Sequence, residues 1–224
     1  MGFSHEWEQR YAANTHLSVW PWSDIVSLVH RHCKPHIAAR GRVLELGCGA
    51  GANIPLFRAL GMNYYAIEGS QTIVAQLHQR YPDLANNIVV GDFTEDQPFA
   101  GSFDLVVDRA AITHNTTTRI KSTLQSIFAS LKLGGVFIAS DWFSTSHTDY
   151  QDGQVTDDKY TRTNYKKGQF CGVGNVHFSD KAHLQDLFSK YEILFMEEKI
   201  IQRHEPSDNH QFASWNIVSR KKDK

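Results

Sequence analysis

The stretch RVLELGCGAGANIPLF, from Arg42 to Phe57, limits most strongly what this chain can fold into. An apolar run with strand character meets three closely spaced glycines and then passes into a helix-like segment. This order is typical of the first strand, loop and helix of a nucleotide-binding α/β sheet. Gly47, Gly49 and Ala52 match the spacing G-x-G-x-x-G/A. Several nucleotide ligands share that spacing, so the rest of the chain has to discriminate between them.

Beyond this loop, short apolar runs alternate with helical patterns, which predicts a parallel sheet with crossover helices. The expected strands of this core are Arg42–Gly47, Asn63–Glu68, Asn87–Gly91, Phe103–Asp108 and Val136–Asp141. Ser70 is placed to cap a helix that ends at Arg80, before Pro82. The segment TTRIKSTLQSIFASLKLGG predicts an amphipathic helix that is closed by Gly134 and Gly135.

The flanks of this core have a different pattern. Ser23 is expected to cap an N-terminal helix, and Ser179 is expected to cap a second one. Two long strand runs, Glu192–Gln202 and Phe212–Arg220, predict an antiparallel hairpin. The polar stretch before Ser179 has no period, as is usual for lids and insertions. We expect a single domain over residues 1–224, made of an N-terminal helical cap (1–41), a cofactor-binding core (42–141), a substrate lid (142–178), and a C-terminal helix with the hairpin (179–224).

Composition and charge exclude some classes of function. The 224 residues, 41% hydrophobic and 21% charged, have the balance of a globular domain with a sizeable core. A formal net charge of -1 gives no reason to expect nucleic acid as a partner. Three scattered cysteines argue against a disulfide framework and for a reducing compartment. Because there is no apolar stretch of about 18 residues and no signal-peptide pattern, we expect a cytoplasmic protein that does not enter a membrane.

Acidic residues in the expected strands and at their ends bear on the choice of ligand. Glu45 lies in a buried strand just before the glycine loop, where a carboxylate is costly unless a cation meets it. A pyrophosphate fits such an acid poorly, whereas a ligand with an ammonium group fits it well. Glu68 ends the second strand and can accept hydrogen bonds from ribose hydroxyls of either kind of ligand. Asp92 ends the third strand and can read an adenine amino group while Phe93 packs against the base.

In this order, the motifs resemble those of the class I S-adenosylmethionine-dependent methyltransferases. The resemblance is carried by VLELGCGAGAN, YYAIEGS, VVGDFTE, FDLVVDRAAITH and LKLGGVFI, and it covers Arg42 to about Ser140. It implies a Rossmann-like α/β fold with a seven-stranded, mostly parallel sheet and helices on both faces. The implied strand order is 3-2-1-4-5-7-6, with the last strand antiparallel. The implied cofactor is S-adenosylmethionine, and the implied activity is that of a methyltransferase.

The resemblance also assigns roles by position. Glu45 and the loop backbone would meet the methionine part of the cofactor, Glu68 the ribose, and Asp92 with Phe93 the adenine. Trp20 and Trp22 lie in an N-terminal segment that would close over the sulfonium, where an indole adds cation–π attraction. The alternative is that they anchor the helix that follows. The residues implied for cofactor binding are Trp20, Glu45, Gly47, Cys48, Gly49, Glu68, Gly69, Ser70, Asp92, Phe93, Asp108 and Arg109.

Methyl transfer to nitrogen or oxygen needs alignment above all, and a general base where the acceptor must lose a proton. The candidates for this catalytic role are His114, Asp108, His177 and Asp141. Each has a structural alternative: a histidine at the position of His114 is often structural in relatives, and Asp141 could anchor a loop. No metal site is expected, because His30 and His32 are two residues apart on a helix and would point to different sides.

Two motifs that the sequence lacks limit the class of molecule that can be the methyl acceptor. The DRAA tip of the fourth strand lacks the Asn-Pro-Pro-Tyr-type turn of enzymes that methylate nucleic acid bases, and the paired-glutamate loop of protein arginine methyltransferases is missing. We therefore expect a small polar metabolite. VWPWSD and GVGNVHF resemble bacterial methyltransferases found with cell-surface polysaccharide genes, which suggests a nucleotide sugar or an amino sugar. Lid residues suited to such a polar substrate are Tyr160, Arg162, Tyr165 and Lys166.

Two other functions stay open. The chain could be a non-catalytic S-adenosylmethionine-binding regulator or a partner subunit, which turnover would distinguish from an enzyme. A dinucleotide oxidoreductase is a third reading, and bound NAD would favour it. The sequence leaves open whether the protein is a monomer or a homodimer.

Overall fold

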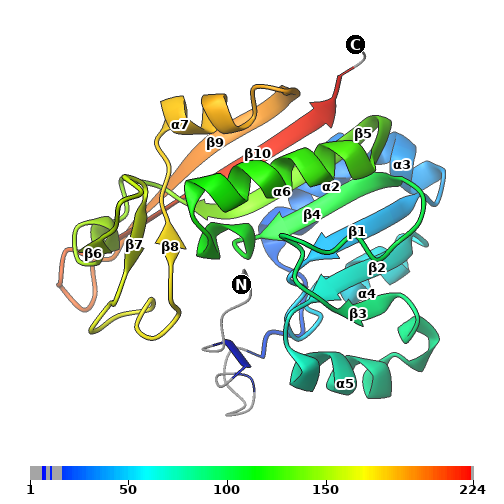
Figure 1. Cartoon of the computed structure of the whole chain (residues 1–224), viewed down its shortest axis with the longest axis horizontal. Coiled ribbons are helices and arrows are strands. Elements are labelled where there is room, and N and C mark those ends of the chain that lie inside the picture. Colours follow the sequence, from blue (N-terminus) through cyan, green and yellow to red (C-terminus); the bar gives the residue numbers. More distant parts are fainter. Residues whose placement is uncertain (1–6, 9–10, 12–16, 223–224) are drawn as a thin grey trace.

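A seven-stranded sheet forms the centre of the fold in the computed structural model, which describes residues 7–8, 11 and 17–222 (Figure 1). Its strands are β1 (Arg42–Leu46), β2 (Asn63–Glu68), β3 (Ile88–Val90), β4 (Phe103–Arg109), β5 (Leu131–Phe143), β9 (Tyr191–Gln202) and β10 (Gln211–Lys221). The strand order is β3-β2-β1-β4-β5-β10-β9, and β10 runs antiparallel to both of its neighbours. This confirms the predicted order and the predicted antiparallel hairpin.

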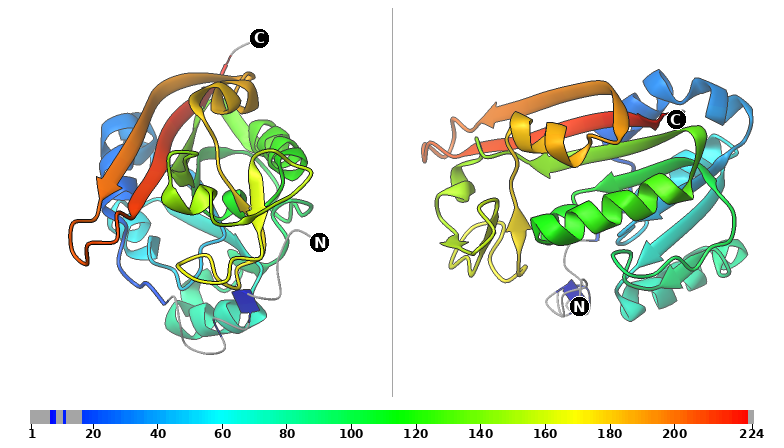
Figure 2. Two further views of the ribbon diagram at one scale, coloured as in Figure 1. Left: turned by 90° about the vertical axis from the view of Figure 1, so that its left-hand side faces the viewer. Right: turned by 45° about the horizontal axis from the view of Figure 1, so that its top comes forward.

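Helices cover both faces of the sheet (Figures 1 and 2). One face carries α2 (Ser23–His32), α3 (Lys34–Ala38), α4 (Ile54–Ala59) and α5 (Gln71–Arg80), and the other carries α6 (Thr117–Ser130) and α7 (Lys181–Leu187). Three short 3₁₀ helices, η1 (Pro82–Leu84), η2 (Ile112–His114) and η3 (Thr148–Tyr150), lie in the connections. Within the described part of the chain, no helix has the length and apolar character that a membrane crossing requires.

The alternation of side chains along the central strands builds two cores. Val43 of β1 packs with α2, α4 and α5, while the next residue, Leu44, packs with α6 and α7. Val107 and Val106 of β4 divide in the same way. Strands buried on both faces read as continuous apolar runs, which is why the sequence showed them clearly. Each such side chain contributes about 1.5–3 kcal/mol on burial.

The predicted helix starts are right in one case and displaced in two. Ser70 caps α5, because its Oγ accepts from Ile73 N at 3.1 Å. Ser23 is instead the first residue of α2 and makes no cap; Trp22 precedes the helix. Asp180, not Ser179, caps α7 by accepting from the backbone N–H three residues later. A carboxylate is as good an N-cap as a hydroxyl, so the adjacent residue competes successfully.

The glycine pair expected at the end of α6 has a different role. The helix ends at Ser130, and both glycines lie inside β5. Phe103 pairs with Leu131 and Leu105 with Val136, so the intervening residues of β5 bulge out of the ladder. Gly134 has φ +72°, and a Cβ on Gly135 would lie 2.8 Å from a backbone oxygen. The glycines therefore permit a bulge and do not form a helix cap.

The polar stretch expected as a lid has structure of its own. β5 runs to Phe143, and a small antiparallel sheet follows, built from β6 (Gln154–Val155), β7 (Thr161–Thr163) and β8 (Val176–His177). Its core is a separate cluster of Phe143, Tyr165, Phe170, Val173, Val176 and Phe178. Strands of two or three residues are too short to show a period in the sequence, which is why the pattern predicted none.

Candidate functional site

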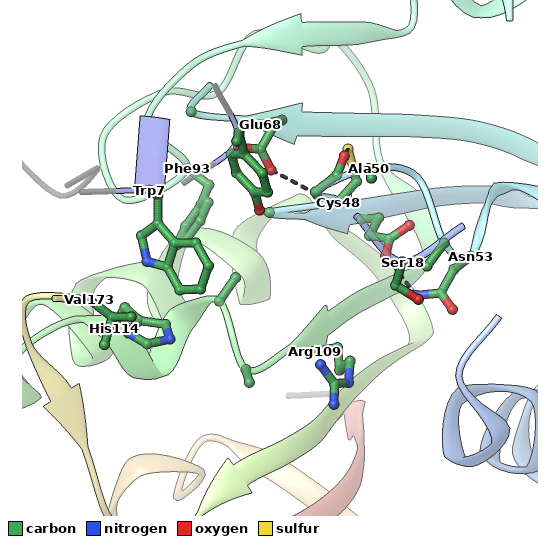
Figure 3. A pocket seen from close by; sticks show the side chains of 18 of the residues that line it. Trp7, Ser18, Cys48, Ala50, Asn53, Glu68, Phe93, Arg109, His114 and Val173 are labelled. Carbon is green, nitrogen blue, oxygen red and sulfur yellow. Dashed lines mark hydrogen bonds between the residues drawn. The ribbon is translucent and has the colours of Figure 1, made fainter. Parts of the chain in front are cut away.

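A cavity of about 410 Å³ opens beside the carboxyl ends of β1, β2 and β4 (Figure 3). Glu45 from β1, Glu68 from β2 and Asp92 from the loop after β3 all line it. The three acids predicted to share a site therefore do face one cavity. Ligands of open parallel sheets bind at this edge, where the loops leave the strands.

The glycine loop brings backbone, not side chains, to the wall of the cavity. Gly47 has φ +62° and Gly49 has φ +51°, conformations that other residues rarely adopt. A Cβ on Gly47 would lie 2.4 Å from the Cβ of Ala111. The backbone N–H of Gly49 donates to Glu68 Oε2 at 2.8 Å, which joins the first two strand ends. The loop therefore leaves room that any larger residue would fill.

Glu45 is buried, and its hydrogen-bond partners among the described residues are two neutral donors. Its carboxylate accepts from Asn53 Nδ2 at 2.8 Å and from the Tyr64 hydroxyl at 2.6 Å. Burial raises the pKa of Glu45 to about 7, although these two hydrogen bonds oppose the shift. Removing water from a carboxylate disfavours its charged form. A ligand cation next to Glu45 would reverse that cost, so this position fits an ammonium group.

Glu68 is held by backbone donors and lies beside a phenol. Its second oxygen accepts from Ser70 N at 2.9 Å. Burial also raises the pKa of Glu68, against the effect of the backbone hydrogen bonds. Burial and the charge of Glu68 together raise the pKa of Tyr11, so this phenol stays a neutral donor at the cavity wall. Asp92, further along, accepts from the backbone N–H and the hydroxyl of Thr94, and Phe93 lines the cavity beside it.

The opposite side of the cavity is mostly aromatic. Trp7 and His114 have ring centroids 5.1 Å apart, His114 and Phe143 6.2 Å, and Phe143 and Phe170 4.7 Å. We call these four residues the aromatic wall. Figure 3 shows His114 and Val173 across the cavity from Glu68 and Cys48. His114 Nδ1 donates to the carbonyl of Asn175 at 3.0 Å, which places the lone pair of the neutral ring on Nε2.

Arg109 lies between these two sides. Its guanidinium stacks 3.5 Å from the ring centroid of Trp22 and donates to Asp141 Oδ2 through Nε at 3.1 Å and Nη2 at 2.9 Å. Burial alone would raise the pKa of Asp141, but Arg109 and Lys199 hold it below its usual value. Ala110, just after β4, and Asp141, inside β5 near its end, both have positive φ, at 56° and 55°. Strained backbone of this kind often occurs at ligand sites.

Most of the residues implied for the cofactor line the cavity, and three do not. Trp20 is 76% exposed and lies outside it, whereas Trp22 is a lining residue. Ser70 caps α5 behind the loop. Asp108 is fully buried and accepts from the backbone N–H groups of Ala111 and Ile112 and from the indole N–H of Trp142. The lining members of the set are Glu45, Gly47, Cys48, Gly49, Glu68, Gly69, Asp92, Phe93 and Arg109.

Of the residues expected as a base, His114 is the one that lines the cavity. Burial raises the pKa of Asp108 to about 7, but its hydrogen bonds direct it to the loop after β4. Asp141 is held between Arg109, Lys199 and Ser214 and anchors the end of β5. His177 is buried against Thr161 and His183, at 3.2 Å and 3.1 Å, away from the cavity.

Several lining residues were not evident from the sequence. Tyr11 lies outside the motifs. Asn53 is the last residue of the first motif and precedes α4, and no role was assigned to it. Phe143 and Phe170 come from the lid. None of the four lid residues expected to meet substrate lines the cavity; Tyr165 packs in the lid core instead. The lid residues Gln169, Phe170 and Val173 do line the cavity, but nothing in their residue types indicated a substrate contact.

Residues 44–139 match the methyltransferase domain family. No curated protein matches the chain by sequence. Solved structures share the fold at low identity. A S-adenosylmethionine-dependent methyltransferase from Methanosarcina mazei has 16% identity and a TM-score of 0.68, with 88% of this chain and 98% of that one covered. A protein from Pyrococcus horikoshii has 15% identity and a TM-score of 0.68, with 98% and 100% covered.

A third structure holds ligands. It is the 1,6-didemethyltoxoflavin N1-methyltransferase of Burkholderia thailandensis, with 1,6-didemethyltoxoflavin and S-adenosylhomocysteine bound. It has 19% identity and a TM-score of 0.57, with 90% of this chain and 87% of that one covered. The match over residues 44–139, the strand order and the acid-lined cavity agree with one another. Residues 44–139 therefore carry the methyltransferase family match on a fold that the whole chain shares with solved S-adenosylmethionine-dependent methyltransferases.

Proposed function

We propose that this protein is a class I S-adenosylmethionine-dependent methyltransferase, and that it methylates a nitrogen or oxygen atom of a small metabolite that binds against its aromatic wall. One observation carries the proposal: a single cavity joins two unlike halves. Buried carboxylates line the half at the tips of β1 and β2, and rings line the half formed by the lid and η2. A cavity divided in this way suits a cofactor and an acceptor lying side by side.

The acid-lined half fits the cofactor group by group. Glu45 would meet the ammonium of the methionine part, Glu68 the ribose hydroxyls, and Asp92 with Phe93 the adenine. The raised pKa of Glu45 supports this, because a buried carboxylate with neutral donors alone is stabilised by an incoming cation. When bound, the cofactor supplies an electrophilic methyl carbon on a positively charged sulfur.

The residues of the chain contribute alignment and proton handling. Holding acceptor and cofactor in line can account for about 7–11 kcal/mol of a barrier. The carbonyl of Asn175 fixes the proton of His114 on Nδ1, so Nε2 is the nitrogen that can take a proton from a hydroxyl or amine acceptor. We assign His114 this role. Asp108 and Asp141 would support the site through the loops that they anchor.

Two classes of acceptor fit different features of the cavity. The aromatic wall favours a flat, unsaturated ring, with Gln169 and Asn115 as nearby polar groups. The Burkholderia neighbour, which binds the heteroaromatic 1,6-didemethyltoxoflavin, is compatible with this. Arg109 lines the cavity as a cation and would favour a nucleotide sugar or another anionic polar metabolite. We place the ring-shaped acceptor first, since Arg109 is already paired with Asp141.

A turnover assay with two substrate panels tests the proposal. The protein is incubated with methyl-labelled S-adenosylmethionine and with either heteroaromatic amines and hydroxyls or amino sugars and nucleotide sugars. We expect labelled product and S-adenosylhomocysteine with a member of the first panel. We expect His114→Gln to lower kcat, and to change its pH profile, while the dissociation constant for S-adenosylhomocysteine stays the same. Calorimetry that detects no S-adenosylhomocysteine binding would refute the function itself.

If the protein only binds the cofactor, the same assay should give a different result. A non-catalytic regulator would bind S-adenosylhomocysteine in calorimetry and yield no labelled product with either panel. In that case, the His114→Gln substitution would have no catalytic effect to show. If labelled product formed with the sugar panel alone, the methyltransferase activity would be confirmed and the proposed class of acceptor would be wrong.

A further inference from the structure

A second group of polar side chains lies in the lid, apart from the methyl-transfer cavity. His147 and Asp149 flank the start of η3, and His210 comes from the turn between β9 and β10. One potential ligand atom from each of the three lies within 4.8 Å of the others. His210 Nε2 is 3.3 Å from Asp149 Oδ1, and the two imidazole centroids are 5.4 Å apart. Figures 1 and 2 show the β9–β10 turn beside this part of the lid.

The polar atoms of this group are not all satisfied. Asp149 is 7% exposed, and its Oδ2 is buried with no hydrogen-bond partner. The hydroxyl of Tyr165, whose pKa is raised by burial and then by the charge of Asp149, is also buried without a partner. The backbone passes close by, since a Cβ on Gly168 would lie 3.7 Å from Asp149 Oδ2. Buried unpaired oxygens in one small region indicate a missing partner such as a cation.

His147 brings its imidazole nitrogens to the same group of side chains. Its Nδ1 accepts from Asp149 N at 3.1 Å, and its Nε2 lies 2.7 Å from Gln169 Nε2. A neutral imidazole has one lone pair, so it cannot accept from two N–H donors. Turning the Gln169 amide over presents its carbonyl oxygen to this region, and the oxygen is then a further candidate ligand. The turned amide oxygen accepts from Nε2–H, which satisfies both ring nitrogens without a metal. A cation at Nε2 would need the tautomer with its proton on Nδ1, and the N–H of Asp149 would then lose its acceptor.

We propose that His147, Asp149 and His210 form a binding site for a divalent metal of the zinc class, with the Gln169 amide oxygen as a fourth donor. Two imidazoles and a carboxylate are the donors that zinc and its neighbours in the first transition row favour. Magnesium and calcium prefer sets made of oxygen alone, and soft cuprous copper prefers thiolates. Phe170, Phe178 and Phe212 pack around His147 and would shield such a site from water.

A metal at this position would tie three distant segments together. His147 and Asp149 follow β5, His210 belongs to the β9–β10 turn, and Gln169 belongs to the lid loop. Gln169 and Phe170 also line the methyl-transfer cavity. The metal would therefore hold the acceptor side of the cavity in place while lying outside the cofactor half. This role does not depend on which metabolite is methylated.

Metal binding to the intact chain, with any affinity tag removed, tests the proposal. After chelator treatment and removal of the chelator, Zn²⁺ is titrated by calorimetry and bound metal is counted by mass spectrometry. Co²⁺ replaces Zn²⁺ for a visible spectrum that reports nitrogen ligands. We expect one equivalent bound and a higher Tm with metal than without. We expect His210→Ala to weaken binding at least about tenfold.

Matched controls keep the outcome clear. His204 lies exposed in the same turn, and His32 belongs to the histidine-rich helix end, so His204→Ala and His32→Ala should bind Zn²⁺ as the unchanged chain does. Asp149→Asn keeps the shape of the side chain and should also weaken binding, which decides the matter if His210→Ala fails to fold. Absence of stoichiometric binding, or a loss with His204→Ala or His32→Ala equal to that with His210→Ala, would overturn the site. Failure of cofactor binding would leave this result unaffected.

Discussion

The two halves of the cavity are built in different ways. The half proposed for the cofactor consists of strand ends and the loops that follow them. Its acids are held by donors at most 19 residues away: Glu68 by the backbone of Gly49 and Ser70, and Glu45 by the side chains of Asn53 and Tyr64. The acceptor half is assembled from rings far apart in the chain, and His114 is fixed by Asn175, 61 residues away. The first half depends on local chain geometry, and the second depends on how the lid packs.

Because of this difference, cofactor affinity and acceptor recognition should respond to different substitutions. A change in the glycine loop or its acids should alter cofactor affinity, because the contacts there are charge-assisted hydrogen bonds. A change in the aromatic wall should alter acceptor recognition alone, because ring packing contributes area without charge. Each variant below is therefore measured with S-adenosylhomocysteine and with an acceptor, and a mixed response would break the distinction.

The largest effect is expected from Glu68→Ala. A charge-assisted hydrogen bond contributes about 1.5–3 kcal/mol, so the loss of the acceptor oxygens for the ribose should weaken S-adenosylhomocysteine binding about 100-fold. The fold should survive, since β2 keeps its pairing with β1 and β3. Calorimetry gives the affinity and circular dichroism the fold. An affinity within about twofold of the unchanged chain would count against the role given to this carboxylate.

The pH dependence of cofactor binding tests Glu45. Its pKa of about 7 lies above the usual value of 4.5, so the free protein holds a proton there below pH 7. Binding an ammonium releases that proton, and S-adenosylhomocysteine affinity should fall up to about tenfold per pH unit below 7. The same shift makes the free energy of unfolding of the free protein decrease as pH rises from 4.5 to about 7. Calorimetry at several pH values should show a flatter profile for Glu45→Gln; a profile identical to that of the unchanged chain would exclude this proton release.

The same contrast explains what the sequence could and could not predict. Glu45, Glu68 and Asp92 lie in or just after continuous apolar runs that predict buried strands, so the sheet and the acid-lined half were both predictable. The pair Gly134–Gly135 matched a helix end and a strand bulge equally well, and only the ladder with β4 decides between them. Of two tryptophans in one short motif, the sequence could not say which would turn inward.

The lid was beyond sequence reasoning for a physical reason. Its strands span two or three residues, and its polar contacts join positions such as Asp149 and His210 that are far apart in the chain. No local propensity encodes such pairs. Tyr165 was expected to meet the substrate, but it packs with Phe170 in the lid core and does not line the cavity.

Phe170→Ala is expected to have a smaller effect, and to act on the acceptor instead of the cofactor. The ring packs on Phe143 at a centroid distance of 4.7 Å and lines the cavity, so its loss should lower kcat/KM for an aromatic acceptor about tenfold. S-adenosylhomocysteine affinity should stay unchanged. Val155→Ala is the matched control in the same lid, because Val155 is 66% exposed and outside the cavity. A loss of cofactor affinity in Phe170→Ala would show that the two halves are coupled.

The smallest effect separates the two neighbouring tryptophans. Trp22 stacks 3.5 Å from the Arg109 guanidinium and lines the cavity, while Trp20 is exposed and outside it. A cation–π contact contributes roughly 0.5–1 kcal/mol at an accessible site, so Trp22→Ala should weaken S-adenosylhomocysteine binding about two- to fivefold through the loss of order at Arg109. Trp20→Ala should change nothing in the same calorimetric measurement. The reverse ranking would mean that the N-terminal segment closes over the cofactor through Trp20, and that the cofactor half depends on more than the strand ends that form it here.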